Sequence, residues 1–316
     1  MTYSRHLTYI VFLAAFGPSV VSAQNGAYEI NQTCALEGCF PGDNAGFPVT
    51  ISASGVYNLT SNLELDSPET TAIEVNEEDV VLNLQDFTID AGNRCTGEIT
   101  DCLNTSLAGI GVFSNQANVV VKNGVVKGFG GIGVNLTGDF SEVHAVDSQH
   151  NFRAGISVGD NATITDSTVS FSGYLGFQAG ASRLQRVRAT NIGQFAITAT
   201  TAHIDQAIVL GNAGTGMYVS RCLITDSVIA RNSVGLWSIE GGNRVIDSQI
   251  SENDGVGIFL QPAIPSDLPS GETLVNSFSG LSLFENNGGN DNPQIGGSGG
   301  LWQSLGPNLC GRDTNC

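Results

Sequence analysis

The sequence predicts an all-β fold, a single-domain solenoid of about nine to eleven stacked coils with a cap at each end. A four-residue phrase that begins with glycine recurs along the chain, as in Gly235–Ser238 and Gly257–Leu260. After a first gap of 37 residues, its second position recurs every 19 to 24 residues, a spacing typical of solenoids. That position is occupied by Ile73, Ile110, Ile132, Ile156, Phe177, Ile197, Met217, Leu236 and Ile258. No helical period runs over a useful length, and glycine is abundant, with 40 residues.

The recurring phrase is interpreted as a strand with one buried face. Side chains alternate between the two faces of a strand, so the residue two positions on should also point inward. We expect this second inward column to be Val75, Val112, Val134, Val158, Ala179, Ala199, Val219, Ser238 and Leu260. The residue between the two columns should point outward, which gives Glu74, Gly111, Gly133, Ser157, Gln178, Thr198, Tyr218, Trp237 and Phe259. The glycine that opens the phrase indicates a turn into the strand.

A second recurring phrase, seen as Ile-Thr-Asp-Ser at 164–167 and 224–227, carries a polar column at its third position. Small polar residues stacked at one turn can form hydrogen bonds along the axis of a solenoid. We therefore predict a structural ladder made of Asp86, Asn123, Asp147, Asp166, Gln206, Asp226 and Asp247, with Arg186 at the same position of one coil. A catalytic or metal-binding role for this column is the alternative.

The chain is expected to divide into a processing segment, a cap and the solenoid. Residues 1–23 have a basic start, an apolar run and a small-residue cleavage site at Ala23, as in a signal peptide. Residues 24–70 are expected to form an N-terminal cap, and residues 71–316 the solenoid with its C-terminal cap. Insertions are expected at 90–108 and 261–280. The mature protein should be secreted, periplasmic or at the cell surface, with no insertion into the membrane.

Six of the seven cysteines lie in pairs that are close in sequence. An exported chain permits disulfides, and the expected pairs are Cys34 with Cys39, Cys95 with Cys102, and Cys310 with Cys316. Cys222 is left over at an inward position, where a thiol behaves as a small hydrophobic group. Zinc is not expected, because neither a CxxC pair nor a histidine cluster accompanies these cysteines.

The formal charge of the full chain is −18, and removal of Arg5 with the leader makes it −19. So acidic a chain argues against nucleic acid as a partner, because phosphates need neutralisation by lysine and arginine. Solubility outside the cell or cation binding fits this charge better, and Ca²⁺ is a possible ligand. The segment 286–300 offers Asp291 for such a site, although its spacing matches no metal-binding loop.

The repeat pattern over residues 71–260 resembles the right-handed parallel β-helix superfamily, to which the pectate lyases belong. The segments 47–51, 82–87, 95–102 and 305–310 also resemble a group of exported bacterial β-helix-repeat proteins of unestablished activity. The resemblance implies the handedness of the coils and an exported location. It implies carbohydrate as the partner and leaves the chemistry open.

Two kinds of chemistry follow from the superfamily. A lyase needs a base and a calcium site to neutralise the uronate carboxylate; Arg153, Arg183, Arg186 and Arg188 fall on neighbouring coils but match no lyase motif. A glycosidase of the polygalacturonase type needs paired carboxylates, and its Asn-Thr-Asp, Asp-Asp and Gly-His-Gly signals are all absent from the sequence. If the protein is an enzyme, a polysaccharide lyase is therefore the better expectation.

The best candidate site is the aromatic row formed by Tyr218, Trp237 and Phe259 in the outward column. Exposed rings in a line provide apolar faces on which sugar rings stack. Trp302 is expected to extend the row, and Arg221, Glu240 and Gln261 are expected to supply polar contacts. The alternatives are a row covered by the 261–280 insertion and a self-association surface. We expect a monomer that binds polysaccharide without catalysis, with a polysaccharide-acting enzyme as the alternative.

Overall fold

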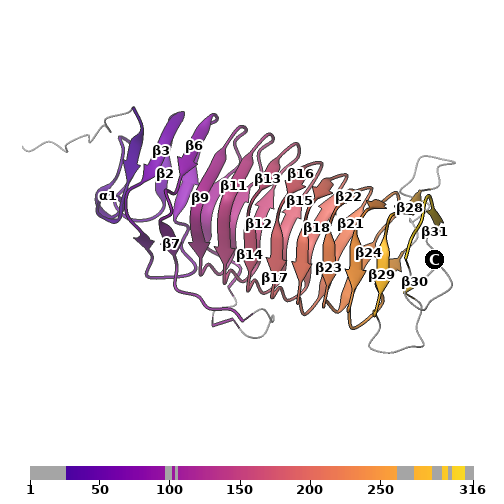
Figure 1. The fold of residues 1–316 in the computed structure, drawn as a ribbon. Helices are drawn as coiled ribbons and strands as arrows, with labels where there is room; N and C mark the ends of the chain where they lie inside the picture. Colours follow the sequence, from indigo (N-terminus) through magenta and orange to yellow (C-terminus); the bar gives the residue numbers. More distant parts are fainter. Residues whose placement is uncertain are drawn as a thin grey trace, which may run out of the picture.

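The computed structural model describes residues 26–96, 102–103, 106–261, 274–286, 294–297 and 301–309. These residues form a parallel β-solenoid, in which strands stack along one axis from the short helix α1 (Gln32–Glu37) at one end to β31 (Leu301–Ser304) at the other (Figure 1). Every pairing between the strands is parallel. The predicted all-β solenoid is therefore confirmed, and the strands fall into three ladders.

The first ladder, sheet I, is an 11-stranded sheet with one strand per coil. It consists of β2 (Val49–Ile51), β5 (Ile73–Val75), β8 (Ile110–Ser114), β10 (Ile132–Leu136), β12 (Ala154–Val158), β15 (Leu175–Ala179), β18 (Phe195–Thr200), β21 (Thr215–Ser220), β24 (Val234–Ser238), β27 (Ile258–Leu260) and β30 (Ile295–Gly297).

The other two ladders, sheets II and III, are joined through two long strands, β9 (Val120–Lys127) and β11 (Glu142–Gln149), which contribute to both. Sheet II adds β1 (Tyr28–Ile30), β3 (Gly55–Leu59), β6 (Val80–Asn83), β13 (Thr163–Thr165), β16 (Arg183–Gln185), β19 (His203–Asp205), β22 (Leu223–Thr225), β25 (Arg244–Ile246), β28 (Val275–Ser279) and β31. Sheet III adds β4 (Leu63–Glu64), β7 (Thr88–Asp90), β14 (Thr168–Ser170), β17 (Arg188–Thr190), β20 (Ile208–Leu210), β23 (Val228–Ala230), β26 (Gln249–Ser251) and β29 (Ser282–Phe284).

The core lies between the three sheets and is filled by side chains at alternate strand positions. In sheet I the first inward column is Val49, Ile73, Val112, Val134, Ile156, Phe177, Ile197, Met217, Leu236, Ile258 and Ile295. Those from Val49 to Ile258 are fully buried. The pairing also reaches further toward the N-terminus than residue 71, because β2 pairs with β5 and β3 pairs with β6.

The expected register is wrong by two residues in the third and fourth coils. Ile110 pairs with Ile132, whereas Ile73 pairs with Val112. The outward column accordingly contains Phe113 and Asn135 in place of Gly111 and Gly133. A shift of two residues keeps every side chain on its own face, so alternation in the sequence does not reveal it.

The glycine of the phrase lies inside the strand or directly before it, and it does not serve as a turn. A Cβ atom on Gly235 would lie 2.6 Å from Cγ2 of Ile250 and 2.8 Å from Nδ2 of Asn253, both inside the solenoid. A Cβ atom on Gly216 would meet Ile229 and Asn232 in the same way. Glycine recurs because the strands of sheet I approach the interior of sheet III too closely for any side chain.

The predicted aspartate ladder is a column of left-handed turns between sheets II and III. Positive φ angles occur at Asp86, Asn123, Ala145, Asp166, Arg186, Gln206, Asp226 and Asp247, and aspartate and asparagine tolerate this region better than most residues. Asp147 is not in the column; Ala145 takes its place, and Asp147 pairs with Thr168 one strand further on. Within the column, the described side chains that contact each other are Asp166 and Arg186, with Arg186 Nε donating to Asp166 Oδ1 at 2.6 Å.

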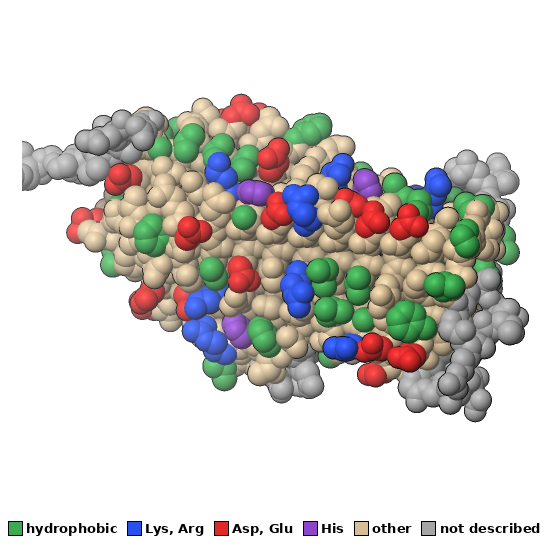
Figure 2. Space-filling view, in the orientation of Figure 1, with side chains coloured by type: hydrophobic (Ala, Val, Ile, Leu, Met, Phe, Trp, Pro, Cys, Tyr) green, Lys and Arg blue, Asp and Glu red, His purple; other side chains and the backbone are tan. Residues whose placement is uncertain are grey.

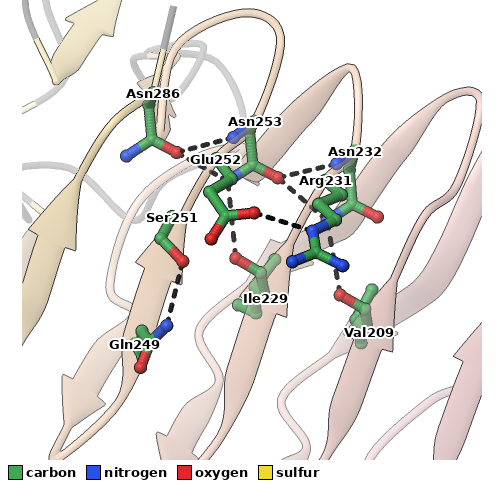
Figure 3. A network of polar contacts seen from close by, with 9 residues as sticks. All are labelled: Val209, Ile229, Arg231, Asn232, Gln249, Ser251, Glu252, Asn253 and Asn286. Carbon is green, nitrogen blue, oxygen red and sulfur yellow. Dashed lines mark hydrogen bonds and ion pairs between the residues drawn. The ribbon is translucent and has the colours of Figure 1, made fainter.

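A buried side-chain ladder also runs along the axis, and the sequence interpretation missed it. Asn212 donates from Nδ2 to Oδ1 of Asn232 at 2.8 Å. In the same way, Asn232 donates to Asn253 at 2.9 Å and Asn253 to Asn286 at 2.7 Å (Figure 3). Each amide oxygen also accepts the backbone N–H of the previous asparagine in the series. We call Asn212, Asn232, Asn253 and Asn286 the asparagine ladder. Because all four are at most 3% exposed, the ladder satisfies backbone groups that water cannot reach.

Two of the predicted disulfides are confirmed. Cys34 is bonded to Cys39 beside α1, and Cys95 is bonded to Cys102 in the 90–108 insertion. The second disulfide packs against Phe152 and Tyr174, and His150 Nδ1 lies 2.6 Å from the carbonyl oxygen of Cys95. The pair of Cys310 and Cys316, the leader 1–23 and Asp291 lie outside the described residues.

Cys222 is free and buried, as expected, and it also takes part in a polar column. Its Sγ accepts the N–H of Ala202 at 3.4 Å, and its own N–H donates to Oδ1 of Asn243. Burial raises the pKa of this thiol. No helix in the described part of the chain is long and apolar enough to cross a membrane.

Candidate binding face

The outward column of sheet I is the surface on which the predicted aromatic residues meet. In order along the axis it consists of Thr50, Glu74, Phe113, Asn135, Ser157, Gln178, Thr198, Tyr218, Trp237, Phe259 and Gly296. The column changes character after Thr198, where polar side chains give way to rings. Parallel pairing places neighbouring members about 4.8 Å apart, so the column is a continuous strip.

The structure brings the aromatic row together on three consecutive strands. The ring centroids of Tyr218 and Trp237 are 5.7 Å apart with planes at 73°, and those of Trp237 and Phe259 are 5.0 Å apart at 67°. All three side chains are partly exposed. Because neighbouring ring planes are steeply inclined to each other, the rings cannot all expose their faces to solvent. The row therefore presents both ring faces and ring edges.

Phe195 adds a fourth ring that the sequence interpretation did not include. Its centroid lies 4.7 Å from that of Tyr218, although it begins β18 and pairs with Thr215. It was missed because it lies three positions before Thr198 and therefore outside the repeating phrase. A search for aromatic residues at strand starts would have found it.

Trp302 does not extend the aromatic row, so that expectation is wrong. It lies in β31, where it pairs with Asn276 in sheet II, and its ring packs against the core residue Phe278 at 5.9 Å between centroids. The strand that follows Phe259 in sheet I is β30, which places Gly296 next in the column. The four-residue phrase recurs at 300–303, but there it belongs to a different sheet.

The predicted polar residues lie where the strands of the aromatic row end. Arg221 and Glu240 form an ion pair at 2.7 Å, and the hydroxyl of Ser220 also donates to Glu240 at 3.2 Å. Gln261 accepts a hydrogen bond from the indole N–H of Trp237 at 3.1 Å. That bond fixes the orientation of the Trp237 ring. The alternative in which the insertion covers the aromatic row concerns residues 262–273, which lie outside the described residues.

The four members before the aromatic row form a polar strip. Ser157 is almost buried, and its hydroxyl lies 3.5 Å from Oε1 of Gln178, which is exposed. The Thr198 hydroxyl is buried beside Tyr218 without a hydrogen-bond partner. Of the four, Gln178 is exposed and Asn135 partly exposed, so the strip offers amide groups on the coils before the rings.

The arginines considered for lyase chemistry do not share a face. Arg183 lies in β16 of sheet II and Arg188 in β17 of sheet III, with Arg186 at the turn between them. Arg186 is engaged by Asp166, and its hydrogen bonds lower the pKa of that carboxyl group. On the face that Figure 2 shows, acidic and basic side chains lie interspersed along the solenoid rather than in one patch. Among the described residues, no three His, Cys, Asp or Glu side chains are arranged to hold a metal ion.

Asp147 is the described carboxyl group whose pKa burial raises. Its Oδ1 is buried without a partner, while Oδ2 accepts a hydrogen bond from Gln149. A raised pKa means that ionisation opposes folding above the unfolded-state pKa of about 3.9. We therefore expect Asp147→Asn to stabilise the protein by up to about 1 kcal/mol near pH 7 and to have no effect near pH 3. Urea unfolding at the two pH values measures this; an equal effect at both would contradict it.

Comparisons with known proteins support the fold. The A-module of a mannuronan C-5 epimerase from Azotobacter vinelandii matches with a TM-score of 0.57 and 13% identity over 82% of this chain and 87% of that chain. The Dettilon tailspike protein matches at 0.60 and 12%, over 81% and 59%. A periplasmic alginate epimerase matches at 0.53 and 10%, over 88% and 83%. No protein-family model and no curated protein matches the sequence. The fold of the chain is the parallel β-helix.

Proposed function

We propose that the protein is an exported β-helix that binds polysaccharide through the outward column of sheet I, with the aromatic row as its anchor. One observation carries this proposal: Tyr218, Trp237 and Phe259 pack ring against ring on consecutive strands and remain partly exposed. Aromatic side chains that lie in a line on a rigid sheet offer sugar rings apolar contacts at little entropic cost.

Two further observations support the proposal. Solved structures of similar fold are described as epimerases of mannuronan and alginate and as a tailspike protein. At 10–13% identity they add weight to the fold and leave the ligand to be argued from this chain's own residues. The two disulfides fit an oxidising compartment outside the cytoplasm, where such polymers occur.

Binding without catalysis is the better interpretation of this face. Epimerisation and elimination at a uronate both need a group that removes a proton beside a carboxylate and a cation that stabilises the charge. Between Phe113 and Gly296 the described outward column contains no carboxylate, histidine, lysine or arginine side chain, and the phenol of Tyr218 has no cation beside it in the column. Arg221 borders the row, but Glu240 already neutralises it.

We expect Trp237→Ala to weaken retention on the polysaccharide by at least about tenfold, or 1.4 kcal/mol, because it removes the central ring of the row. Affinity electrophoresis against a panel of neutral and uronate polymers measures retention. Phe140→Ala is the matched control, since Phe140 is an exposed aromatic residue at the turn before β11, outside the outward column, and should leave retention unchanged. Trp237→Phe should restore much of it.

The outcomes separate binding from its alternatives. Equal retention of the parent and Trp237→Ala on every polymer would end the proposal. A change of mass in light scattering on Trp237→Ala, without retention by the parent, would assign the row to self-association. New unsaturated or reducing ends after incubation with any polymer would assign the protein to an enzyme class.

A further inference from the structure

On the basis of the proposed function, we infer that the ligand is a neutral polysaccharide whose chain runs along the solenoid axis, and not a polyuronate. The first step is the charge of the face. From Asn135 to Phe259 the outward column consists of an amide, a hydroxyl, an amide, a hydroxyl and three rings, with no carboxylate, ammonium or guanidinium group among them. A polyuronate carries a carboxylate on every sugar and needs cations at matching intervals.

The second step is the charge of the borders. At the turns that follow the strands of sheet I, Asp139 and Asp160 are exposed, and Asp160 accepts a hydrogen bond from the N–H of Ala181. Glu240 lies at the same border and holds Arg221 in the 2.7 Å ion pair. Among the described residues that border the strands from β10 to β27, Arg153, just before β12, is the exposed arginine without an ion-pair partner. The border is therefore net negative and would repel a polyanion.

The third step is the shape of the face. Seven consecutive strands, from β10 to β27, span about 29 Å at a spacing of about 4.8 Å. Each strand contributes one outward side chain, so the contacts form a line parallel to the axis. A chain lying along that line would form hydrogen bonds with Asn135 and Gln178 over one half and stack on the aromatic row over the other.

The fourth step is the dependence on salt. A neutral ligand releases no counterions, so its affinity should change by less than about twofold between 0.05 and 0.5 M salt. A polyuronate drawn by Arg153 would bind more weakly as salt rises, because its attraction is screened. Salt dependence therefore distinguishes the two ligand classes independently of the rank order of affinity.

The test is affinity electrophoresis of the full mature chain against β-glucan, mannan and galactan as neutral polymers, and against alginate and polygalacturonate with and without Ca²⁺. We expect retention by at least one neutral polymer, insensitive to salt and lost with Trp237→Ala, and none by the polyuronates. Gln178→Lys should introduce affinity for polyuronate, whereas Gln178→Ala should only weaken binding of the neutral polymer.

Tighter binding to alginate or polygalacturonate, with or without Ca²⁺, would overturn this inference while the proposed function stands, provided that it depends on Trp237. Retention by a neutral polymer that is unaffected by Trp237→Ala would reject the face itself. Retention by no polymer, with the parent folded by circular dichroism, would reject the proposed function together with the inference.

Discussion

Asn232→Leu is expected to lower the free energy of unfolding by about 4 kcal/mol, because it breaks the asparagine ladder at a side chain that is fully buried. The backbone N–H and the Nδ2 of Asn212 would both lose their acceptor on Asn232, at 3.2 and 2.8 Å. Each buried donor left without a partner costs about 1–3 kcal/mol. Leucine has the same number and branching of side-chain heavy atoms as asparagine, so no cavity opens. Its methyl groups are bulkier than the amide, so overpacking adds to the loss of hydrogen bonding.

Urea unfolding followed by far-ultraviolet circular dichroism measures this loss. Asn44→Leu is the matched control, because Asn44 is exposed and its side chain forms no hydrogen bond, and it should change stability by less than about 0.5 kcal/mol. A loss below about 1 kcal/mol for Asn232→Leu would mean that water or backbone shifts satisfy Asn212, and that the ladder is dispensable.

Gly235→Ala is expected to cost about 3 kcal/mol, although it adds a single methyl group. Its Cβ would collide with the carbonyl oxygen of Gly257, a backbone atom of the next coil, and would lie 2.6 Å from Cγ2 of Ile250. Backbone of the next strand cannot rotate away as a side chain can, so neighbouring coils must separate. Urea unfolding again provides the measurement.

Gly211→Ala serves as the contrast for this prediction. Gly211 has a positive φ of 64° but open space around its Cβ direction, so alanine there should cost only about 1 kcal/mol of backbone strain. Equal losses at Gly235 and Gly211 would show that backbone conformation, and not the close approach of coils, explains the recurring glycine.

The sequence predicts the fold well because the repeat samples the same geometry many times. Inward columns such as Ile156, Phe177 and Ile197 are apolar in coil after coil, and only a stacked solenoid buries all of them. Local cysteine spacing likewise predicts both described disulfides, since residues five and seven apart in a short loop can meet. Those inferences depend on period and proximity, which a sequence displays directly.

The register in the third and fourth coils was not predictable for a physical reason. The shift that exchanges Ile110 for Val112 and Asp147 for Ala145 equals the period of a strand, so both alignments bury the same kinds of side chain. For Asp147, the left-handed turn falls on Ala145, where alanine is unusual, so the sequence has no marker for it. The prediction for Trp302 was wrong for a similar reason, because the same four-residue phrase occurs there in sheet II rather than in sheet I.

The asparagine ladder was not predicted, because asparagine at such positions usually indicates a different kind of structure. The series 212, 232, 253 and 286 shows the period of the coil, but asparagine between strands ordinarily indicates an exposed turn. Only burial distinguishes the two cases, and burial depends on where the turn lies in three dimensions. The aromatic row, in contrast, was predictable. Aromatic side chains at an outward position do not fill the core, so their recurrence on consecutive coils stands out in the sequence.

The asparagine ladder also ties the C-terminal coils to one another. Toward the N-terminus the same turn position is occupied by Ile192, whose N–H is the first that the ladder accepts, and by Ser172, whose buried hydroxyl has no partner. From Asn212 onward each coil is tied to the next by amides that both donate and accept, so opening one coil exposes unsatisfied groups in its neighbours. We therefore expect the amides of the coils that carry the ladder to exchange with solvent together rather than coil by coil. Tyr218, Trp237 and Phe259 lie on these coils, so a ligand that spans the three rings would contact strands that the ladder holds in a fixed spacing.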